Sequence, residues 1–265
     1  MSRVPQRSPP RKNIMILERF SLAGKTAVIT GAGRGIGFAI AHAFAEAGAK
    51  IIIADRDAAL GMQAAVTLGA AAEFAALDVS DSASVRAVSA DLHRRYHRID
   101  ILVNNAAICE IVDALATTDD IWRRHMAVNL DGLFYCCREF GRQMVAAQQG
   151  AIVNIVSIGA LIEPRLQHHI AYGASKAGVA QLTRSLAVEW ASSGVRVNAV
   201  APGYTATELA LTAGHELIQS WLPHIPLGRL MEPAEIAAAV LFFASAASSG
   251  LTGAMLAVDG GYTVL

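Results

Sequence analysis

The chain is poor in charged residues. Asp, Glu, Lys and Arg make up 17% of its 265 residues, whereas about a quarter is usual for a folded domain. Hydrophobic residues account for 54%, so much of the folded surface must be apolar. The composition therefore predicts that the protein buries part of this surface in subunit interfaces.

The sequence also lacks a hydrophobic run that could cross a bilayer. Its longest apolar stretch, Ile236 to Ala247, is too short and too rich in alanine, because a spanning helix needs about 20 apolar residues. Neither end of the chain has the pattern of a signal peptide. We therefore expect no membrane association and a soluble, cytoplasmic protein.

Cysteines are few, and their spacing suits neither a metal site nor a disulfide framework. Cys136 and Cys137 are adjacent in a stretch of helical character, and Cys109 stands apart from them. Without a C-x-x-C pair, these thiols are best interpreted as small core residues. We expect no metal in this protein.

The net charge is zero but unevenly distributed. The first 14 residues carry four basic and no acidic residues, which leaves 18 basic against 22 acidic residues in the remainder. This negative remainder argues against nucleic-acid binding. We expect residues 1–20 to be a disordered basic extension, since prolines and charges dominate them. Residues 21–265 contain no linker and are expected to form one domain.

Short apolar segments alternate with amphipathic ones along this domain. Apolar strands without polar alternation, each followed by a helix, predict a parallel sheet covered on both faces. The expected fold is α/β, a doubly wound, Rossmann-type sheet of about seven parallel strands. The predicted strands are Lys25 to Thr30, Lys50 to Asp55, Ala72 to Leu77, Ile101 to Asn104, Ala151 to Ser157, Arg196 to Val200 and Ala254 to Val258, and the predicted helices after the first are Ala58 to Leu68, Ser82 to Tyr96, Asp119 to Ala147, Ala171 to Ala191 and Pro233 to Ala246.

A glycine cluster follows the first strand and precedes the first helix. Residues 30–37 read T-G-A-G-R-G-I-G. Glycines let the backbone turn sharply and approach a pyrophosphate at a helix N-terminus. Tight turns of this kind also occur without ligands, but the position after the first strand favours a nucleotide site. The candidate cofactor contacts in the cluster are Gly31, Arg34, Gly35, Ile36 and Gly37.

An acidic residue, Asp55, ends the second strand, 18 residues after Gly37. A carboxylate at this place can accept hydrogen bonds from the adenosine ribose and would repel the 2′-phosphate of NADP, so NAD is favoured. The neighbouring Arg56 leaves NADP open, because a guanidinium could hold that phosphate. Alternatively, Asp55 could cap the helix that begins near Asp57.

Polar residues follow the third and fourth strands as well. Asp78 and Val79 come after the third strand, and Asn104, Asn105 and Ala106 after the fourth. The carboxyl ends of the strands are where an open α/β sheet binds its ligand. Taken by spacing alone, these could be ordinary turn residues.

Tyr172 and Lys176 are four residues apart in a run of good helix formers. That spacing places both side chains on one helix face. An ammonium near a phenol favours the phenolate, so Lys176 is expected to lower the pKa of Tyr172 and make it a usable acid or base. The ordinary alternative is a buried tyrosine and a solvated lysine that share a face.

These motifs, with Asn129 and Ser157, resemble the pattern of the short-chain dehydrogenase/reductase family over nearly all of residues 22–265. The quoted pieces are T-G-A-G-R-G-I-G, D-V, N-N-A-A and Y-G-A-S-K. The resemblance implies that Tyr172 is the general acid/base and that Ser157 stabilises the reacting oxygen. It implies that Lys176 acts on Tyr172 and on the nicotinamide ribose, and that Asn129 holds a water connecting Lys176 to solvent.

The segment after the sixth strand reads P-G-Y-T-A-T, from Pro202 to Thr207. In the family pattern its last Thr contacts the nicotinamide carboxamide, which makes Thr207 the candidate here. Pro202, Gly203 and Thr205 are the other expected cofactor contacts, and Thr205 could make a polar contact of its own. Residues 208–227 are expected to form a mobile lid over the substrate.

The loop between Ser157 and Tyr172 bears on the substrate. It is two residues longer than is usual in the family and is polar, which suits a hydroxylated substrate, since buried hydroxyls need partners. With A-V-D-G-G-Y-T-V at residues 257–264, it is similar to polyol and sugar dehydrogenases such as the galactitol-oxidising members. The candidate substrate residues are Glu163, His168, His169 and Tyr204.

The sequence therefore predicts an oxidoreductase that transfers hydride between NAD(H) and a secondary alcohol or ketone of a polyol or sugar. Two alternatives stay open: an NADPH-dependent 3-oxoacyl thioester reductase and a non-enzymatic dinucleotide-sensing protein. The resemblance also implies a homotetramer, with the helices around Asn129 and Tyr172 at one interface and the last strand at another.

Overall fold

Seven parallel strands form one sheet in the order β3-β2-β1-β4-β5-β6-β7. The computed structural model describes every residue except 1–14, 165–166, 212–213 and 265. The chain moves outward from β1 to β3 and then returns beside β1 with β4, so the strand order reverses at that point. This confirms the doubly wound sheet and places a crevice at the carboxyl ends of β1 and β4. The strands are β1 (Thr26–Thr30), β2 (Lys50–Asp55), β3 (Ala72–Ala76), β4 (Ile101–Asn104), β5 (Gly150–Ile155), β6 (Val195–Pro202) and β7 (Met255–Val258).

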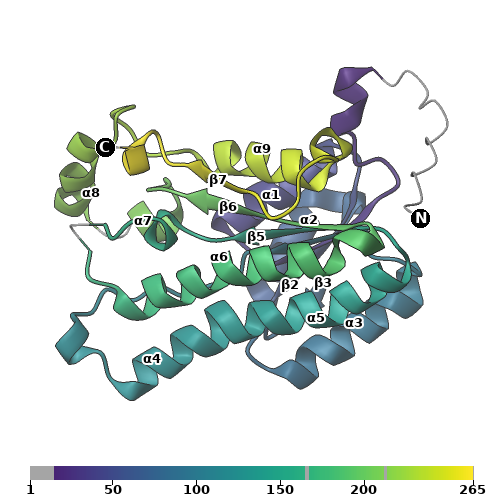
Figure 1. Ribbon diagram of the computed structural model, residues 1–265, viewed down its shortest axis with the longest axis horizontal. Helices are drawn as coiled ribbons and strands as arrows, with labels where there is room; N and C mark the ends of the chain where they lie inside the picture. The colour runs from purple at the N-terminus through teal and green to yellow at the C-terminus, as the bar shows by residue number, and fades with distance from the viewer. Residues whose placement is uncertain (1–14, 165–166, 212–213, 265) are drawn as a thin grey trace, which may run out of the picture.

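Helices cover both faces of the sheet (Figure 1). One face packs against α1, α2 and α9, and the other against α3, α5 and α6. Within one strand, Val28 faces the second layer while Ala27 and Ile29 face the first. Both faces are apolar for that reason, and the strands show no polar alternation. The helices are α1 (Gly35–Glu46), α2 (Ala58–Leu68), α3 (Ser82–Tyr96), α4 (Asp119–His125), α5 (Gly132–Ala146), α6 (Ile170–Trp190), α7 (Glu208–Leu211), α8 (His215–Trp221) and α9 (Pro233–Ala244).

Most element boundaries lie within two residues of those predicted, and the exceptions have physical causes. β6 agrees within two residues but is longer than expected, because it pairs with β5 from Val195 and with β7 as far as Pro202. The predicted helix of residues 119–147 is continuous, but Met126–Asp131 forms a π-helical segment between α4 and α5. Residues 208–227, the segment predicted to be a lid, contain α7 and α8. The sequence did not predict these helices, because both are short and their apolar residues show little helical periodicity.

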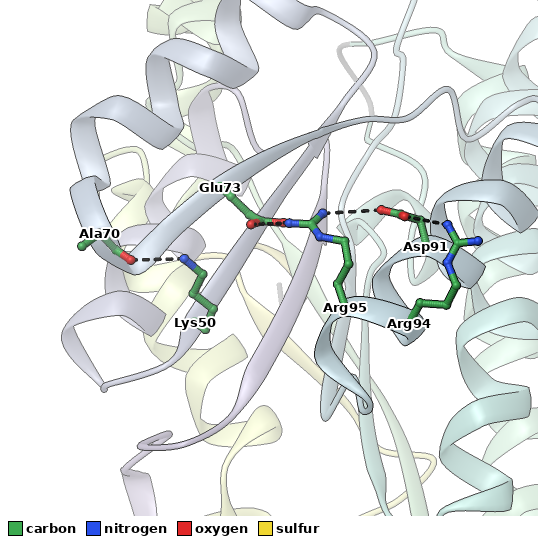
Figure 2. A network of polar contacts seen from close by, with 6 residues as sticks. All are labelled: Lys50, Ala70, Glu73, Asp91, Arg94 and Arg95. Atoms are coloured by element: carbon green, nitrogen blue, oxygen red, sulfur yellow. Dashed lines mark hydrogen bonds and ion pairs between the residues drawn. The ribbon is translucent and has the colours of Figure 1, made fainter.

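The outer strand β3 is tied to α3 by a surface network of charged groups. Arg95 donates to both carboxylate oxygens of Glu73, at 2.6 and 2.7 Å, and lies near Asp91, which also accepts from Arg94 (Figure 2). On the neighbouring strand, Lys50 donates to the carbonyl of Ala70 (Figure 2). An edge strand offers unpaired backbone groups to other chains, and charged side chains beside it disfavour such pairing.

The segment that precedes β1 is partly described. Residues 1–14 of the expected disordered extension lie outside the described residues. Ile16–Phe20 forms a 3₁₀ turn, so the expectation of disorder fails for this part. The ring of Phe20 lies 6.3 Å from that of Phe242 on α9, and this apolar contact gives the turn something to pack against. Among the described residues, no helix has both the length and the apolar character needed to cross a membrane.

A partly buried arginine, Arg196, joins the start of β6 to the end of α9. The Arg196 guanidinium donates to the carbonyls of Phe243, Ser245 and Ser248 and to the Ser248 hydroxyl, at 2.8 to 3.2 Å. The last carbonyls of a helix have no hydrogen-bond partners within it. A cation at that end also interacts favourably with the negative end of the helix dipole. Arg196 therefore holds α9 against the sheet.

Replacing Arg196 with Met should lower the free energy of unfolding by about 2–4 kcal/mol, because four hydrogen bonds from a charged group to the end of α9 are lost. Chemical denaturation followed by circular dichroism measures the change. Arg142→Met, at an exposed position of α5, is the matched control and should change stability by less than about 0.5 kcal/mol. Equal effects of the two substitutions would contradict this assignment.

Candidate active site

The glycine turn is pressed against the end of β4. Gly31 has φ +61°, and a Cβ there would lie 2.8 Å from the Cα of Ala106, while a Cβ on Gly37 would collide with the Gly31 carbonyl oxygen. The Asn105 side chain donates to the carbonyls of Thr30 and Gly31, at 3.0 and 2.9 Å. Only glycine fits these two positions, and the turn leads directly into the N-terminus of α1, where backbone N–H groups can receive an anion.

Asp55 supports this turn from the neighbouring strand. Its Oδ2 accepts from the backbone N–H of Gly33 at 2.9 Å, and its Oδ1 from that of Asp57 at 3.0 Å. The residue that caps α2 is Asp57, which accepts from two backbone N–H groups of the first helical turn. The alternative in which Asp55 is the helix cap is therefore wrong. Arg56 lines the same crevice beside it.

Two adjoining cavities run along the carboxyl edge of the sheet. The first, of about 370 Å³, and the second, of about 500 Å³, share Ile36, Asn105, Ala107 and Thr207, so they form one continuous crevice. Every residue predicted to bind the cofactor lines it. Gly31, Arg34, Gly35, Ile36, Gly37, Asp55, Arg56, Asp78, Val79, Asn105, Ala106 and Thr207 line the first cavity, and Tyr172, Lys176, Pro202, Gly203, Thr205 and again Thr207 line the second.

Ser157, Tyr172 and Lys176 meet in the second cavity. Ser157 follows β5, and its Oγ accepts from the backbone N–H of Gly159 at 3.1 Å. Tyr172 and Lys176 project from the first turns of α6, with Nζ 5.6 Å from the centre of the phenol ring. Nζ donates to the carbonyl of Ile155, at the end of β5, at 2.8 Å. The i, i+4 spacing thus brings both groups to the serine, as predicted.

Burial controls the protonation of this pair. It raises the pKa of Tyr172, a nearby charge on Cys109 acts in the same direction, and hydrogen bonding with Ser157 opposes both. Burial lowers the pKa of Lys176 to about 8. The expectation that Lys176 lowers the pKa of Tyr172 is therefore not met in this structure. The ammonium lies against the ring and bonds a carbonyl, while loss of solvent dominates the phenol.

Asn129 lies behind the crevice and does not line it. Its side chain, 1% exposed, donates to the Ile108 carbonyl and to Ser175 Oγ and accepts from the Ile108 N–H. Ser175 in turn donates to the carbonyl of Tyr172 at 2.7 Å. Asn129, in the π-helical segment, therefore links the segment that follows β4 to α6, the helix that carries Tyr172. Both amide hydrogens are used, so a water could bind only a remaining oxygen lone pair or the backbone.

The candidate substrate residues separate into two groups. His169 and Tyr204 line the second cavity, whereas Glu163 and His168 do not. His168 is exposed and pairs with Asp113, and the Glu163 side chain is 66% exposed. The structure therefore places Glu163 and His168 outside the cavity, because both side chains reach the solvent.

The structure also adds residues to the cavity that the sequence did not single out. Cys109 and Trp221 line it. Trp221 comes from α8 in the predicted lid, but nothing in its spacing showed that the indole points inward. Thr205 has its hydroxyl bonded to the Gly203 carbonyl at 3.0 Å, so its expected polar contact is internal. Among the described residues, no group of three His, Cys, Asp or Glu side chains is placed to hold a metal ion.

Comparison with known proteins places this crevice in a family. Residues 31–263 match the family model described as enoyl-(acyl carrier protein) reductase. The chain is 52% identical over 248 residues to galactitol 2-dehydrogenase (L-tagatose-forming) of Cereibacter sphaeroides, covering 92% of this chain and 97% of that one. It is 45% identical to galactitol 2-dehydrogenase of Rhizobium johnstonii, covering 93% and 98%. It is 39% identical to 3-oxoacyl-[acyl-carrier-protein] reductase of Chlamydia trachomatis, covering 91% and 98%.

Solved structures agree with this placement. A short-chain type dehydrogenase/reductase from Mycobacterium marinum superposes with a TM-score of 0.91 at 37% identity, covering 94% of this chain and 100% of that one. A gluconate 5-dehydrogenase from Burkholderia cenocepacia, in complex with NADP and tartrate, gives a TM-score of 0.89 at 39% identity, covering 94% and 99%. With its glycine turn, its doubly wound sheet and its serine, tyrosine and lysine in one cavity, the chain belongs to the short-chain dehydrogenase/reductase family.

Proposed function

We propose that this protein catalyses the reversible oxidation of a secondary alcohol of an open-chain polyol or sugar, with NAD as its cofactor. The observation that carries the proposal is the meeting of Ser157, Tyr172 and Lys176 in the cavity that continues the glycine-lined crevice. The 52% identity to a galactitol 2-dehydrogenase supports the polyol class. The small-molecule substrate would enter the second cavity.

In this proposal the protein residues supply proton transfer and orientation. Tyr172 takes the proton of the alcohol, or returns it to the ketone, and Ser157 hydrogen-bonds the reacting oxygen as its charge develops. Lys176 holds positive charge beside the phenol and is held in turn by the Ile155 carbonyl. Asn129 fixes the backbone on which Tyr172 sits. A bound nicotinamide would supply the hydride chemistry.

For each part of NAD, the crevice contains residues that could contact it. The glycine turn and the start of α1 would receive the pyrophosphate. Asp55 would accept from the adenosine ribose, and Asp78 and Val79 lie where the adenine would rest. Lys176 and Thr207 would contact the nicotinamide ribose and carboxamide. A Cβ placed on Gly35 would lie 3.7 Å from Thr207 Cγ2, so these two residues are near neighbours in the crevice.

NAD is proposed over NADP because of Asp55. The carboxylate is fixed by two backbone donors, so it cannot readily swing away from a 2′-phosphate. Arg56 lines the crevice beside it and is the group that would favour NADP. The Burkholderia cenocepacia relative was solved with NADP, so the choice depends on the balance between these two neighbours.

The two alternatives are less well supported. Identity to the 3-oxoacyl-[acyl-carrier-protein] reductase of Chlamydia trachomatis is 39%, against 52% for the galactitol enzyme. A non-enzymatic dinucleotide-sensing protein would not need the serine, tyrosine and lysine together, and here they share a cavity.

We also propose a homotetramer. Large apolar side chains remain exposed on the outer helices and on the last strand: Trp122 is 41% exposed, Phe134 38%, Val188 83% and Leu256 41%. The first three lie on α4, α5 and α6, and Leu256 on β7, the two regions expected to form interfaces. Burying these side chains between subunits would remove apolar surface from water.

Replacing Tyr172 with Phe should lower kcat for a polyol by about 10²–10⁴-fold, because the acid/base hydroxyl is lost. The ring remains, so NAD binding, measured by calorimetry, should stay within about threefold (roughly 0.6 kcal/mol) of wild type. Tyr135→Phe, on α5 outside both cavities, is the control and should leave both quantities unchanged. Turnover by the Tyr172 variant at a near-normal rate would mean that another group is the base.

Replacing Arg56 with Ala should weaken NADPH binding by roughly five- to fiftyfold, about one charge-assisted hydrogen bond, and leave the dissociation constant of NADH almost unchanged. Fluorescence titration of both cofactors on both proteins measures this. Wild type should still bind NADH more tightly. Tighter NADPH binding by wild type would overturn the NAD assignment.

The stability of the protein should depend on pH through Lys176. Its folded pKa of about 8 lies below its ordinary value of 10.5, so the unfolded chain binds more protons between these two values and stability rises with pH there. Relative to Lys176→Met, wild type should gain about 1–3 kcal/mol of unfolding free energy from pH 7 to pH 10. Denaturation curves at each pH measure the difference. A constant difference would show that Lys176 is not desolvated.

A further inference from the structure

Two buried ring nitrogens in the substrate cavity have no hydrogen-bond partner. They are Nδ1 of His169 and Nε1 of Trp221, and both residues line the second cavity. The side chains are 4% and 3% exposed. Leaving a buried polar group without a hydrogen-bond partner costs about 1–3 kcal/mol of folding stability. Two such groups in one cavity indicate that a bound ligand supplies the missing hydrogen bonds.

The two nitrogens belong to different parts of the chain that line the same cavity. His169 precedes α6, and its ring lies 5.3 Å from the ring of Tyr172, between the backbones of Gly159 and Gly173. Burial lowers the pKa of His169, so the imidazole is neutral near pH 7 and can both donate and accept. Glu163 Oε1 stands 3.8 Å from Nδ1, too far for a hydrogen bond.

Trp221 is held by an aromatic stack. Its indole lies parallel to the ring of Tyr204, with centroids 4.4 Å apart, and Tyr262 packs edge-on against Tyr204. The stack joins α8, the loop after β6 and the C-terminal turn, so it fixes the indole rigidly. It also gives the cavity a flat apolar wall beside an N–H donor, which suits a carbon chain that carries hydroxyl groups.

We propose that His169 and Trp221 bind hydroxyl groups of an open-chain polyol at carbons other than the one that is oxidised, with the Tyr204–Trp221 stack against its carbon chain. This assignment rests on the proposed polyol dehydrogenase activity and specifies how its substrate is selected. The hydrocarbon part of an acyl chain has no group that could hydrogen-bond these nitrogens, so the site would discriminate against it. The two residues act on substrate selection, and Tyr172 and Ser157 act on the reaction.

The test uses two six-carbon secondary alcohols with the full chain and NAD: galactitol, which has six hydroxyls, and 2-hexanol, which has one. Trp221→Phe keeps the aromatic wall and removes only the N–H. It should lower kcat/KM for galactitol by about tenfold to hundredfold, mainly through KM, and change that for 2-hexanol by less than about twofold. His169→Phe, which removes both nitrogens, should act in the same direction.

Trp190→Phe, at the end of α6 and outside both cavities, is the matched control and should change kcat/KM for neither substrate. Equal losses for galactitol and 2-hexanol would show that Trp221 only supports the lid, and would overturn the inference. A wild-type protein that oxidises 2-hexanol but no polyol would instead defeat the proposed function.

Discussion

The hydrogen bond from Lys176 to the carbonyl of Ile155 is the interaction on which the site depends. It joins the first turns of α6 to the carboxyl end of β5, two residues before Ser157. Because the ammonium is buried, it has no water to bond instead, and the carbonyl fixes where the helix begins relative to the sheet. Ser157, which follows β5, and Tyr172 and Lys176, which lie on α6, are thereby held in one cavity.

Buried amides fix the same helix further along. Asn154 Nδ2 donates to Thr183 Oγ1, Thr183 donates to the Val179 carbonyl, and Asn104 Nδ2 donates to Asn154 Oδ1, all at 2.9 Å. β4, β5 and α6 are thus joined by directional bonds in addition to apolar packing. Such bonds permit one register, whereas apolar contacts alone would allow small sliding. The glycine turn is held to β4 in the same manner by Asn105.

Features carried by local pattern could be predicted from the sequence. Apolar runs in the sequence predicted the strands. The glycine cluster predicted the tight turn, where the backbone around Gly31 and Gly37 leaves no room for a Cβ. The i, i+4 spacing gave the meeting of Tyr172 and Lys176 because a helix has a fixed period. Which of two adjacent histidines points inward was not predictable, since it depends on how the loop meets residues 112 and 113: the bridge from Val112 turns His169 toward the cavity and leaves His168 outside.

The protonation of the pair could not be predicted from spacing either. Proximity alone says that Lys176 lowers the pKa of Tyr172, but the desolvation of each group depends on everything packed around it. Burial moves the pKa of the tyrosine up and that of the lysine down, because loss of solvent disfavours the charged form of each group. The role of Asn129 was hidden for a similar reason, because a π-helical segment and a contact to Ile108 are set by tertiary packing.

Several polar groups of the framework are well supplied with partners: Arg196 has four acceptors, and Asp100 bonds Lys25, Arg98 and the N–H of Thr26. Asn104 Oδ1 and Gln143 Oε1 are buried without a partner there. Along the crevice, His169 Nδ1 and Trp221 Nε1 have no partner either, and Lys176 keeps a strongly lowered pKa. The two unpartnered nitrogens and the desolvated ammonium each lower the free energy of unfolding. Groups of this kind are found where ligand binding or catalysis makes use of them. It is the combination of unpartnered nitrogens with a cavity that also holds Ser157 and Tyr172 that supports a hydroxylated substrate there.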